Sequence, residues 1–456
     1  MYDIKQINAW LAEHSELKEL MYQASRYYKQ NNDGINSRKK VMGIIREDKG
    51  TGEKRTLQVE DPYASNEKLS SGFLRQQIKQ KVNYLINEDI TLSDEEKEFS
   101  VDYPDWKKDL KKLSTKISYQ IYGAWQFYIE NGETKYKYID GMQIYPVYLT
   151  NQNTPDLILR HYTTMDNMEK LIVYDNKVEV HYKRHNITKG WEEEKTLPIV
   201  RKSRVIADEV IDEEIVQLSQ PPFAICYNNN DWITDLHPIK AFVDIYDKVN
   251  SDFANNIIDF QEIYHTLKNY QGQDLQEFNE QLKKLKVVPV GEDGEMQTHQ
   301  IEVPVIAKTT FLELTRKNIY EFGMAVDVNN IATGNATVVA IQSMYENLNM
   351  KASDFEQEIQ DFWRQVIRLT NEFNQILGNG KQYDNYLEFD KSMISNINEV
   401  YERLSKWVGF IPDNILFRLL PDVDEEEAMQ LTEEGRNQLK TEILVDEEDD
   451  INESAE

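Results

Sequence analysis

One stretch in the C-terminal half carries apolar residues at helical spacing without interruption, and it constrains the fold more than any other feature. Between residues 341 and 376 the spacing alternates between four and three. The residues that form this seam are Ile341, Tyr345, Leu348, Ala352, Phe355, Ile359, Phe362, Val366, Leu369, Phe373 and Ile376. Such spacing places them on one face and predicts a single helix that spans on the order of 50 Å at ~1.5 Å per residue. Gly378 and Gly380 follow and indicate its end.

The apolar face of this helix has two interpretations. A face of this kind usually packs into the core of its own domain, and it can also pack against a second copy of the chain. No polar residue interrupts the seam to fix a coiled-coil register, and the flanking charges of a free coiled coil are only partly present. An ordinary buried helix is therefore the first expectation and self-association the second.

Helical and β-rich sections alternate along the rest of the chain, so we predict an α+β fold that is mainly helical. The N-terminal part predicts helices at about 3–30, 65–87 and 104–117, with Ser65 or Asn66 as the cap of the second. A β-rich section follows at about 119–226. Its signals are runs of Tyr, Ile and Val at 119–129, 136–139, 144–148, 157–163, 169–174 and 178–183, separated by turns at Asn131-Gly132, Asp140-Gly141 and Asp175-Asn176.

The chain becomes helical again from Asp235. Apolar residues share one face of this helix, namely Phe242, Ile245, Val249, Phe253, Ile257 and Phe260. We then expect, in order, a strand near 263–267, a helix at about 275–285, two short strands around Gly291–Gly294, a helix at about 305–326, an uncharged stretch from Val328 to Tyr345 that opens as a loop, the long helix, more helix at 391–407 and a disordered acidic tail at 441–456.

The formal net charge of −28 is unevenly distributed. Residues 421–456 hold 15 Asp and Glu against Arg436 and Lys440, so they account for −13 of that charge. The electrostatic field of an acidic chain does not attract nucleic acid or an anionic membrane. Any contact with DNA must therefore be local, or the acidic surface must keep DNA from adhering to it. Cys226 is the one cysteine. A single cysteine excludes an internal disulfide and a cysteine-based zinc site, and it is typical of a protein made in a reducing cytosol. We expect Cys226 to be a small buried residue and not a nucleophile.

The common catalytic motifs are absent from the sequence. It contains no G-x-x-x-x-G-K-[ST], G-x-G-x-x-G, G-x-S-x-G or H-E-x-x-H pattern. The run from Gly50 to Lys54 has the residue types of a phosphate loop at the wrong spacing, which favours a surface turn. We also find no signal peptide and no apolar run long enough to cross a membrane. A site assembled from distant residues would leave none of these motifs.

Two groups of polar residues could carry chemistry, and each has a simpler interpretation. His181 and His185 share a strand face and could bind one ion, but no third ligand is evident, so a solvated strand is favoured. Asp244, Asp247 and Asp252 lie on the polar side of the helix that follows Asp235. A solvated or inter-subunit face is favoured there over a metal or acid–base role. We therefore expect no catalytic residue, no cofactor and no metal ion.

The order of features from 232 to 376 is the most informative pattern: helix, small mixed insertion, helix, uncharged loop, long helix. Short motifs accompany it in a fixed order: Tyr27-Tyr28 with Gly34-Ile35, Asn66-x-Lys-Leu69-x-x-x-Phe73 before Lys81-Val-Asn-Tyr84-Leu85, Gly123-Ala-Trp, Tyr138-Ile-Asp140 before Ile144-Tyr-Pro146-Val-Tyr148, and Asp235-Leu-His-Pro-Ile-Lys-Ala-Phe-Val-Asp-Ile-Tyr-Asp247 before Ser251-Asp-Phe-Ala-Asn-Asn256 and Asp259-Phe260. Together they resemble the portal proteins of tailed bacteriophages, the head–tail connectors, and specifically the type found in long-tailed phages of Gram-positive bacteria. The resemblance covers nearly the whole chain and is weakest in the C-terminal tail.

This resemblance implies a portal-type architecture of wing, stem, clip and crown. The implied parts are a wing at 1–232 and 341–380, stem helices at 233–260 and 305–327, a clip at 261–304, a tunnel loop at 328–340, a crown at 390–440 and the acidic tail at 441–456. It also implies a ring of twelve subunits at one capsid vertex, with double-stranded DNA passing through its channel during packaging and ejection.

The same assignment implies site residues. The tunnel loop offers short neutral side chains that would touch moving DNA without holding its phosphates: Asn329, Asn330, Thr333, Gly334, Asn335 and Thr337. Basic residues before the loop are candidates for centring the duplex, although exposed helix charge explains them equally well: Lys308, Arg316 and Lys317. The candidate contacts of the clip with the motor and connector are Lys283, Lys284, Lys286, Glu292 and Asp293.

The resulting hypothesis is a portal subunit that assembles and does not catalyse. Its implied partners are copies of itself, the terminase large subunit, head-completion and adaptor proteins, and the major capsid and scaffold proteins, with no membrane contact. It would be made in the host cytoplasm and end at the portal vertex of the virion. The alternatives are another self-assembling phage head component and, less favoured, a carboxylate-dependent DNA-processing enzyme.

Overall fold

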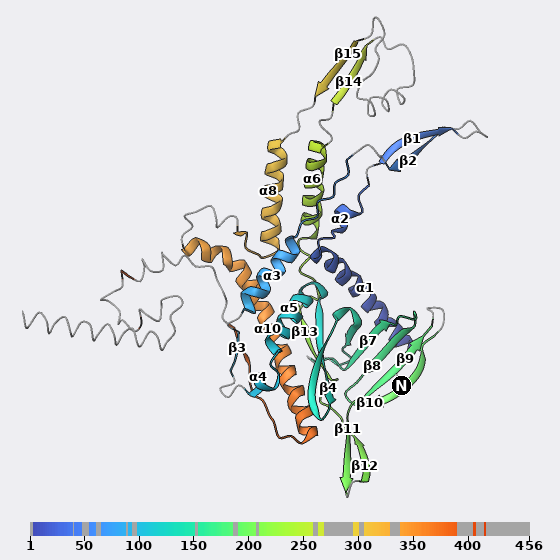
Figure 1. Ribbon diagram of the computed structural model, residues 1–456, viewed down its shortest axis with the longest axis vertical. Helices are drawn as coiled ribbons and strands as arrows, with labels where there is room; N and C mark the ends of the chain where they lie inside the picture. The colour runs from blue at the N-terminus through green and yellow to red at the C-terminus, as the bar shows by residue number, and fades with distance from the viewer. Residues whose placement is uncertain are drawn as a thin grey trace, which may run out of the picture. The chain divides into compact units, whose positions relative to one another are not determined.

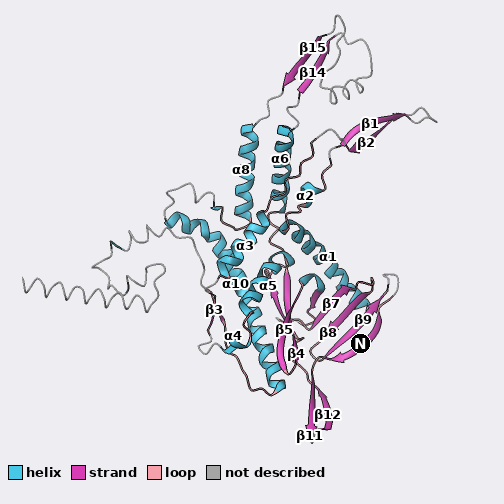
Figure 2. Ribbon diagram, viewed as in Figure 1, coloured by secondary structure: helices cyan, strands magenta, loops and turns pink. Residues whose placement is uncertain are grey.

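The computed structural model describes residues 3–39, 41–47, 54–60, 65–87, 90–93, 98–150, 154–185, 190–206, 209–258, 263–268, 295–300, 305–328, 338–389, 405–406 and 415 (Figure 1). The chain divides into two compact units. One contains Met1–Val326 and Met350–Lys391, and the other Asp327–Asn349 and Ser392–Glu456. Nearly all of the described residues belong to the first unit, which contains both helices and sheets (Figure 2).

The long helix is confirmed as α10, Val338–Leu377. Nine residues of the predicted seam, from Tyr345 to Phe373, are buried within the chain, so the face belongs to an intramolecular core. Gly378 and Gly380 follow the helix with φ of 69° and 71°. This left-handed conformation suits glycine and ends the helix where the sequence predicts.

The N-terminal section forms five helices and a hairpin within the described residues: α1 Ile4–Tyr28, α2 Asp33–Asn36, α3 Phe73–Leu85, α4 Glu98–Asp102, α5 Trp106–Gln120, and the antiparallel pair β1 Val41–Glu47 and β2 Lys54–Glu60. The predictions at 3–30 and 104–117 are confirmed to within a few residues. The prediction at 65–87 is wrong in its first third. Helix α3 begins at Phe73, with Gly72 as its cap residue, and Ser65–Gly72 is not helical.

The β-rich section forms two antiparallel sheets and a separate hairpin. The three-stranded sheet has the order β13-β4-β5, with β4 Tyr122–Glu130, β5 Glu133–Ile139 and β13 Phe223–Tyr227. The five-stranded sheet has the order β10-β9-β8-β7-β6, with β6 Ile144–Val147, β7 Leu157–Thr163, β8 Glu169–Tyr174, β9 Val178–Arg184 and β10 Glu192–Pro198. The hairpin pairs β11 Arg201–Ile206 with β12 Glu209–Ile215.

The three turns predicted in this section have different outcomes. Asn131-Gly132 joins β4 to β5 with positive φ at both residues, and Asp175 begins the turn between β8 and β9. Asp140-Gly141 is not a hairpin turn, because β5 and β6 belong to different sheets. Asp140 instead caps the short helix η1, Gly141–Gln143. A Cβ at Gly141 would lie 1.9 Å from the Tyr122 carbonyl oxygen, so glycine permits the chain to pass against β4.

Helices α6, Lys240–Ile258, and α8, Val305–Phe322, run side by side, with the rings of Phe242 and Phe322 stacked at 5.1 Å (Figure 1). Beyond them β14, Ile263–Lys268, pairs antiparallel with β15, Glu295–Gln300. These elements confirm the strand near 263–267, a strand after Gly294 and the helix near 305–326. The expected helix at 275–285, the strand before Gly291, the loop at 329–336, nearly all of the helix at 391–407 and the acidic tail lie outside the described residues.

The largest core cluster packs α10 against α3, α5 and the three-stranded sheet. Trp125 on β4 stacks on Tyr136 at 4.2 Å and meets Phe362 of α10 edge-on at 5.0 Å. On the outer strand β13, Gln365 of α10 accepts from Ile225 N and donates to Ile225 O, at 3.1 and 3.2 Å. Helix α10 thus supplies both the core packing and an amide that pairs with this sheet edge. Strand β16, Leu387–Glu388, which follows α10, pairs with β3, Thr91–Leu92.

Cys226 is buried in the same cluster, and burial raises the pKa of its thiol well above the ordinary value, which confirms the small buried residue expected there. None of the helices that the structure describes has the length and apolar character needed to cross a bilayer.

Candidate functional site

Helix α6 buries polar side chains and leaves much of its apolar face exposed. Asp247, Ser251 and Asn255 are each 0% exposed, whereas Ile245 and Ile257 are 38% and 61% exposed. The three polar residues are spaced by four and therefore share one helix face. The sequence prediction of a solvated or inter-subunit polar face is thus wrong for Asp247.

The extended segment Ser65–Gly72 lies along this polar stripe. The backbone N–H groups of Ser71, Leu69 and Glu67 donate to Asp247 Oδ1, Ser251 Oγ and Asn255 Oδ1, at 2.9, 2.9 and 2.7 Å. Asn255 also donates from Nδ2 to the Glu67 carbonyl oxygen at 3.2 Å, as a neighbouring strand would. Alternate residues of the segment thereby match every fourth residue of the helix. We call this set of contacts the clasp.

The clasp explains why the helix predicted from residue 65 does not form. Within a helix, the N–H groups beyond the first turn bind carbonyl oxygens of the same helix. Here, alternate N–H groups of the segment bind side chains of α6, which lie 176 to 188 positions further along the chain. A pairing at that distance leaves no local signal, whereas the apolar spacing of 65–87 does.

The other two aspartates of α6 hold the N-terminal section. Asp244 accepts from the Tyr27 hydroxyl and pairs with Lys240 Nζ at 2.7 Å. Together with burial, this hydrogen bond raises the pKa of Tyr27. Asp252 pairs with Arg38. Each of these two carboxylates therefore already has a structural partner, and among the residues that the structure describes no three metal-ligating side chains come together.

A buried charge cluster lies before the start of α6. Lys81 Nζ is 2.8 Å from Asp235 Oδ2 and donates to Asn228 Oδ1 at 2.7 Å. Asn228 Nδ2 donates to Asp235 Oδ1 at 2.9 Å, and Lys351 Nζ is 3.4 Å from Asp235 Oδ2. Burial lowers the pKa of Lys81 to about 8, while the two lysines hold the pKa of Asp235 at about 2. These four residues join α3, the end of β13, the approach to α6, and α10.

The C-terminal end of α8 is held by α3 and α10. Gln77 Nε2 donates to Ile319 O at 3.0 Å, and Gln80 Nε2 donates to Val326 O at 2.7 Å. Lys351 donates to the carbonyl oxygen of Gly323 at 3.0 Å. A Cβ at Gly323 would lie 2.3 Å from the Gln77 amide oxygen, so the contact with α3 requires glycine there. The chain therefore enters its uncharged stretch from a fixed point.

The structure places only part of the predicted site. On α8, the ammonium of Lys308 lies 5.6 Å from the Phe253 ring centre, the guanidinium of Arg316 lies 5.4 Å from that of Tyr320, and Lys317 is exposed. The predicted tunnel-loop and clip residues lie outside the described residues: Asn329, Asn330, Thr333, Gly334, Asn335, Thr337, Lys283, Lys284, Lys286, Glu292 and Asp293.

The pair His181 and His185 gives no sign of a metal site. His181 Nε2 lies 2.9 Å from Glu179 Oε1 on the same strand, and His185 is exposed just after that strand ends. Both positions fit the half-solvated strand that the sequence favours.

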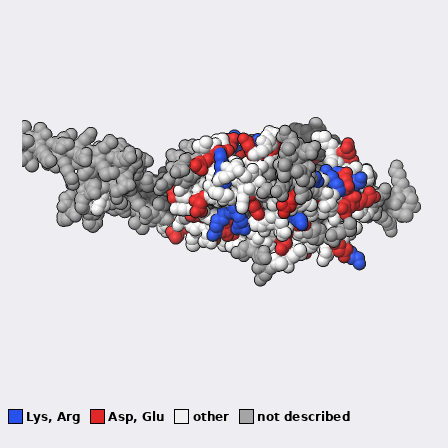
Figure 3. Space-filling view, turned by 90° about the horizontal axis from the view of Figure 1, so that it is seen from below, with Lys and Arg blue, Asp and Glu red and all other residues white. Residues whose placement is uncertain are grey.

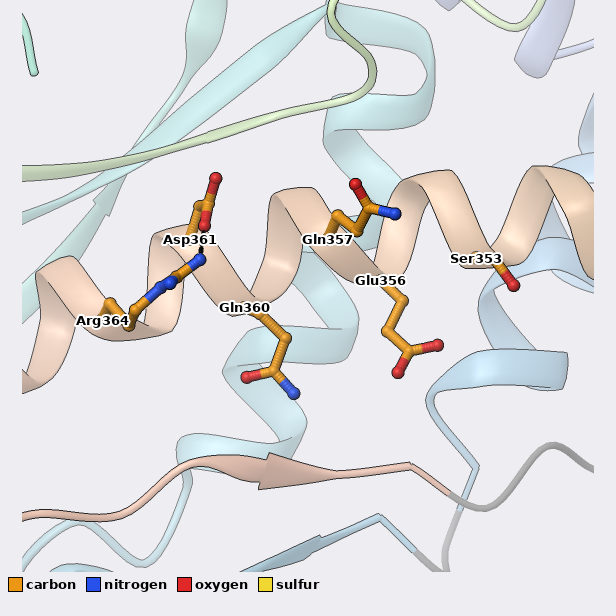
Figure 4. A pocket seen from close by; sticks show the side chains of 6 residues that line it. All are labelled: Ser353, Glu356, Gln357, Gln360, Asp361 and Arg364. Carbon is orange, nitrogen blue, oxygen red and sulfur yellow. Dashed lines mark hydrogen bonds and ion pairs between the residues drawn. The ribbon is translucent and has the colours of Figure 1, made fainter. Parts of the chain in front are cut away.

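A pocket of about 400 Å³ lies along α10 (Figure 4). The residues that line it are Ser353, Glu356, Gln357, Gln360, Asp361 and Arg364. All six are polar, and all lie on one helix. Because small-molecule sites combine an apolar lining with a few polar groups from several elements, this pocket lacks the features of such a site.

Charged side chains are mixed on the face seen in Figure 3. Acidic residues spread over the described part of this face, and basic residues gather in smaller groups among them. This distribution agrees with the net charge of −28. A continuous basic surface, which would hold nucleic acid by its phosphates, is not visible over the described residues of this face.

The residues that fix the helix pair lie outside the site predicted from the sequence: Lys81, Asp235, Ser251, Asn255 and Lys351. One signal could have found Lys81, because it lies among Ile78, Val82 and Leu85 on the apolar face of α3. A lysine on such a face needs a buried partner. The two stretches that carry the strongest motifs, Asn66–Leu85 and Asp235–Asn256, are also those that the clasp and the charge cluster join.

Comparisons with known proteins agree with this reading of the motifs. The chain matches the family model described as "Phage portal protein, SPP1 Gp6-like" over residues 7–441. It is similar to the portal protein of Clostridium phage phiCD119, with 25% identity over 463 residues that cover 94% of this chain and 96% of the relative. It is also similar to the portal protein of Bacillus phage SPP1, with 25% identity over 425 residues that cover 87% of this chain and 82% of the relative.

Among solved structures, the chain resembles subunits of the gene transfer agent. The neck of the native particle, computed with C12 symmetry, matches with a TM-score of 0.37 and 10% identity over 77% of this chain and 91% of the other. A chain of the native virion matches with a TM-score of 0.37 and 8% identity over 76% and 90%. The family model spans nearly the whole chain, so this protein belongs to the SPP1 Gp6-like family of phage portal proteins.

Proposed function

We propose that this portal protein forms a closed ring of twelve subunits at one vertex of the capsid, and that double-stranded DNA passes through the ring during packaging and ejection. The observation that carries the proposal is the helix pair α6 and α8, which a single subunit leaves with a large apolar surface. The clasp turns the polar stripe of α6 inward, so part of its apolar face points away from the subunit.

The exposed apolar residues run along both helices. They are Ile245, Ile257 and Ile258 on α6, and Val305, Ile306, Phe311, Leu314 and Phe322 on α8. Exposed large apolar side chains concentrated on one helix pair favour an interaction surface there. In a ring, different faces of one subunit contact its two neighbours, so every copy of the surface can be covered. We therefore assign α6 and α8 to the stem.

The remaining parts follow the portal assignment. We assign 1–232 and 341–380 to the wing, 261–304 to the clip, 328–340 to the tunnel loop and 390–440 to the crown. The uncharged loop and the acidic chain suit a channel that DNA passes without adhering. Because the clip connects the C-terminal end of α6 to the N-terminal end of α8, it is the proposed docking site of the terminase large subunit and, later, of the adaptor proteins. The virion is the proposed final location.

Native mass spectrometry and negative-stain microscopy test the ring directly. We expect a closed oligomer with an axial hole from the purified chain. A monomer with metal-dependent activity on DNA would instead support an enzyme.

A variant pair tests whether the helix pair forms the interface. Leu314→Glu puts a charge on the exposed apolar surface, so we expect a folded monomer with an unchanged circular dichroism spectrum. Glu313→Gln, at the neighbouring exposed position of α8, should assemble like the wild type. Normal rings from Leu314→Glu would place the subunit contacts elsewhere.

A further inference from the structure

The pair of Lys81 and Asp235 is complete without Lys351. Lys81 donates to Asn228 Oδ1, and its ammonium lies 2.8 Å from Asp235 Oδ2 and 4.2 Å from the centre of the Phe355 ring. Asp235 has Asn228 on one carboxylate oxygen and Lys81 on the other. One cation and one anion, both with side chains no more than 4% exposed, therefore balance each other as an ion pair.

Lys351 is an additional, more loosely held member of the charge cluster. Its distance of 3.4 Å to Asp235 exceeds the 2.8 Å of Lys81, and its side chain is 16% exposed against 2% for Lys81. The two ammonium groups repel each other, and this repulsion contributes to the lowered pKa of Lys81. The firmer contact of Lys351 is with the Gly323 carbonyl oxygen at 3.0 Å.

The contact between Lys351 and Gly323 lies where the chain leaves and re-enters its first compact unit. The chain leaves the first compact unit after Val326 and returns to it at Met350. Gly323 and Lys351 lie just inside these two crossing points. Their contact therefore joins the two ends of the segment that contains the uncharged stretch, at the end of α8 and within α10.

We propose that Lys351 is a detachable catch, which ties α10 to the end of α8 and can release without leaving an unpaired buried charge. When it is engaged, the cluster holds two lysines and one aspartate. When it is released, Lys351 reaches water through its exposed side, and Lys81 and Asp235 remain an ion pair in which each has a hydrogen bond with Asn228. Both arrangements leave each buried charge beside one of opposite sign, which is the condition for an element with two accessible states.

Hydrogen exchange of backbone amides tests the catch in the full chain. The N–H groups of Gly323, Met324 and Ala325 donate to Ile319, Glu321 and Tyr320, so their exchange reports the opening of this end of α8. Lys351→Met should speed their exchange roughly tenfold, since a hydrogen bond from a charged donor is lost. The unfolding midpoint should stay close to that of the wild type, because the buried pair is intact.

Two further variants sharpen the test. Lys81→Met leaves Lys351 as the one lysine beside Asp235, so the catch should tighten and exchange at 323–325 should slow. Lys381→Met removes an exposed ion pair with Asp102, at 2.6 Å, and should leave that exchange unchanged. If Lys81→Met fails to fold, the comparison of Lys351→Met with Lys381→Met decides alone.

Three results would overturn the proposal. They are exchange in Lys351→Met within twofold of the wild type, a loss of stability in Lys351→Met as large as in Asp235→Asn, and faster exchange in Lys81→Met. None of these measurements involves DNA or ring assembly, so the catch can fail while the proposed function stands, and the reverse also holds.

Discussion

The clasp predicts that single side chains of α6 hold the extended segment Ser65–Gly72 in place. Asn255→Ala removes both hydrogen bonds to Glu67, and Ser251→Ala removes the acceptor of Leu69 N–H. Each polar group left buried without a partner costs about 1–3 kcal/mol, and alanine returns about 0.5 kcal/mol through its higher helix propensity. We therefore expect a net loss of roughly 0.5–2.5 kcal/mol for Ser251→Ala and a larger loss for Asn255→Ala.

Adjacent asparagines on α6 provide the matched control. Asn255 is 0% exposed and faces the segment, whereas Asn256 is half-buried on the next position of the helix. Urea unfolding gives the change in stability, and hydrogen exchange at Glu67, Leu69 and Ser71 shows where it arises. Asn255→Ala should lower the unfolding free energy and speed exchange at these amides, and Asn256→Ala should leave their exchange unchanged. Equal behaviour of the two variants would refute the clasp as a source of stability.

Three further predictions concern the charge cluster, the core and the channel. Asp235→Asn leaves Lys81 buried without an anion and should cost about 3–5 kcal/mol in urea unfolding. The pKa of Asp235 is about 2 against an ordinary 3.8, so its stabilisation is present above pH 3.8 and is lost as the pH falls toward 2, a loss that Asp235→Asn should not show in acid titrations. Phe362→Asp buries a charge in the core of α10 and should abolish soluble, assembled protein in size-exclusion chromatography. Asn335→Lys with Thr337→Lys should leave rings intact in electron micrographs and reduce the yield of packaged DNA, and an unchanged yield would count against the tunnel-loop assignment.

Elements with a strong local period could be predicted from the sequence. The seam of α10 repeats over ten turns, so no local alternative competes with a helix, and its glycine stop is also local. The strands β7 to β9 were found for the same reason, because their apolar runs are bounded by turn residues. The hairpin turn predicted at Asp140-Gly141 was wrong because an Asp-Gly pair also suits the start of a helix. Only the separation of β5 and β6 into two sheets distinguishes a helix cap from a hairpin turn here.

The candidate site was predictable in position but not in chemistry. Hydropathy rules turn the apolar face of a helix inward, and α6 departs from them because its polar stripe is fully buried inside the chain while Ile245 and Ile257 stay exposed. A single sequence cannot show which face has the partner when that partner is 180 or so positions away. The charge cluster was missed for the same reason, since Lys81, Asp235 and Lys351 lie in three separate parts of the chain.

The polar stripe also fixes the position of α6 along the segment Ser65–Gly72, which apolar contacts alone would not do. Apolar packing has no direction, so a helix held by it alone can shift along its neighbour at low cost. A shift of four helix residues, about 6 Å, would bring Asp247 opposite Leu69 and Ser251 opposite Glu67, which preserves two acceptors for two N–H groups. It would separate Asn255 from Glu67, where one amide matches both a backbone N–H and a carbonyl. Asn255 is therefore the residue that distinguishes the observed register from its nearest alternative.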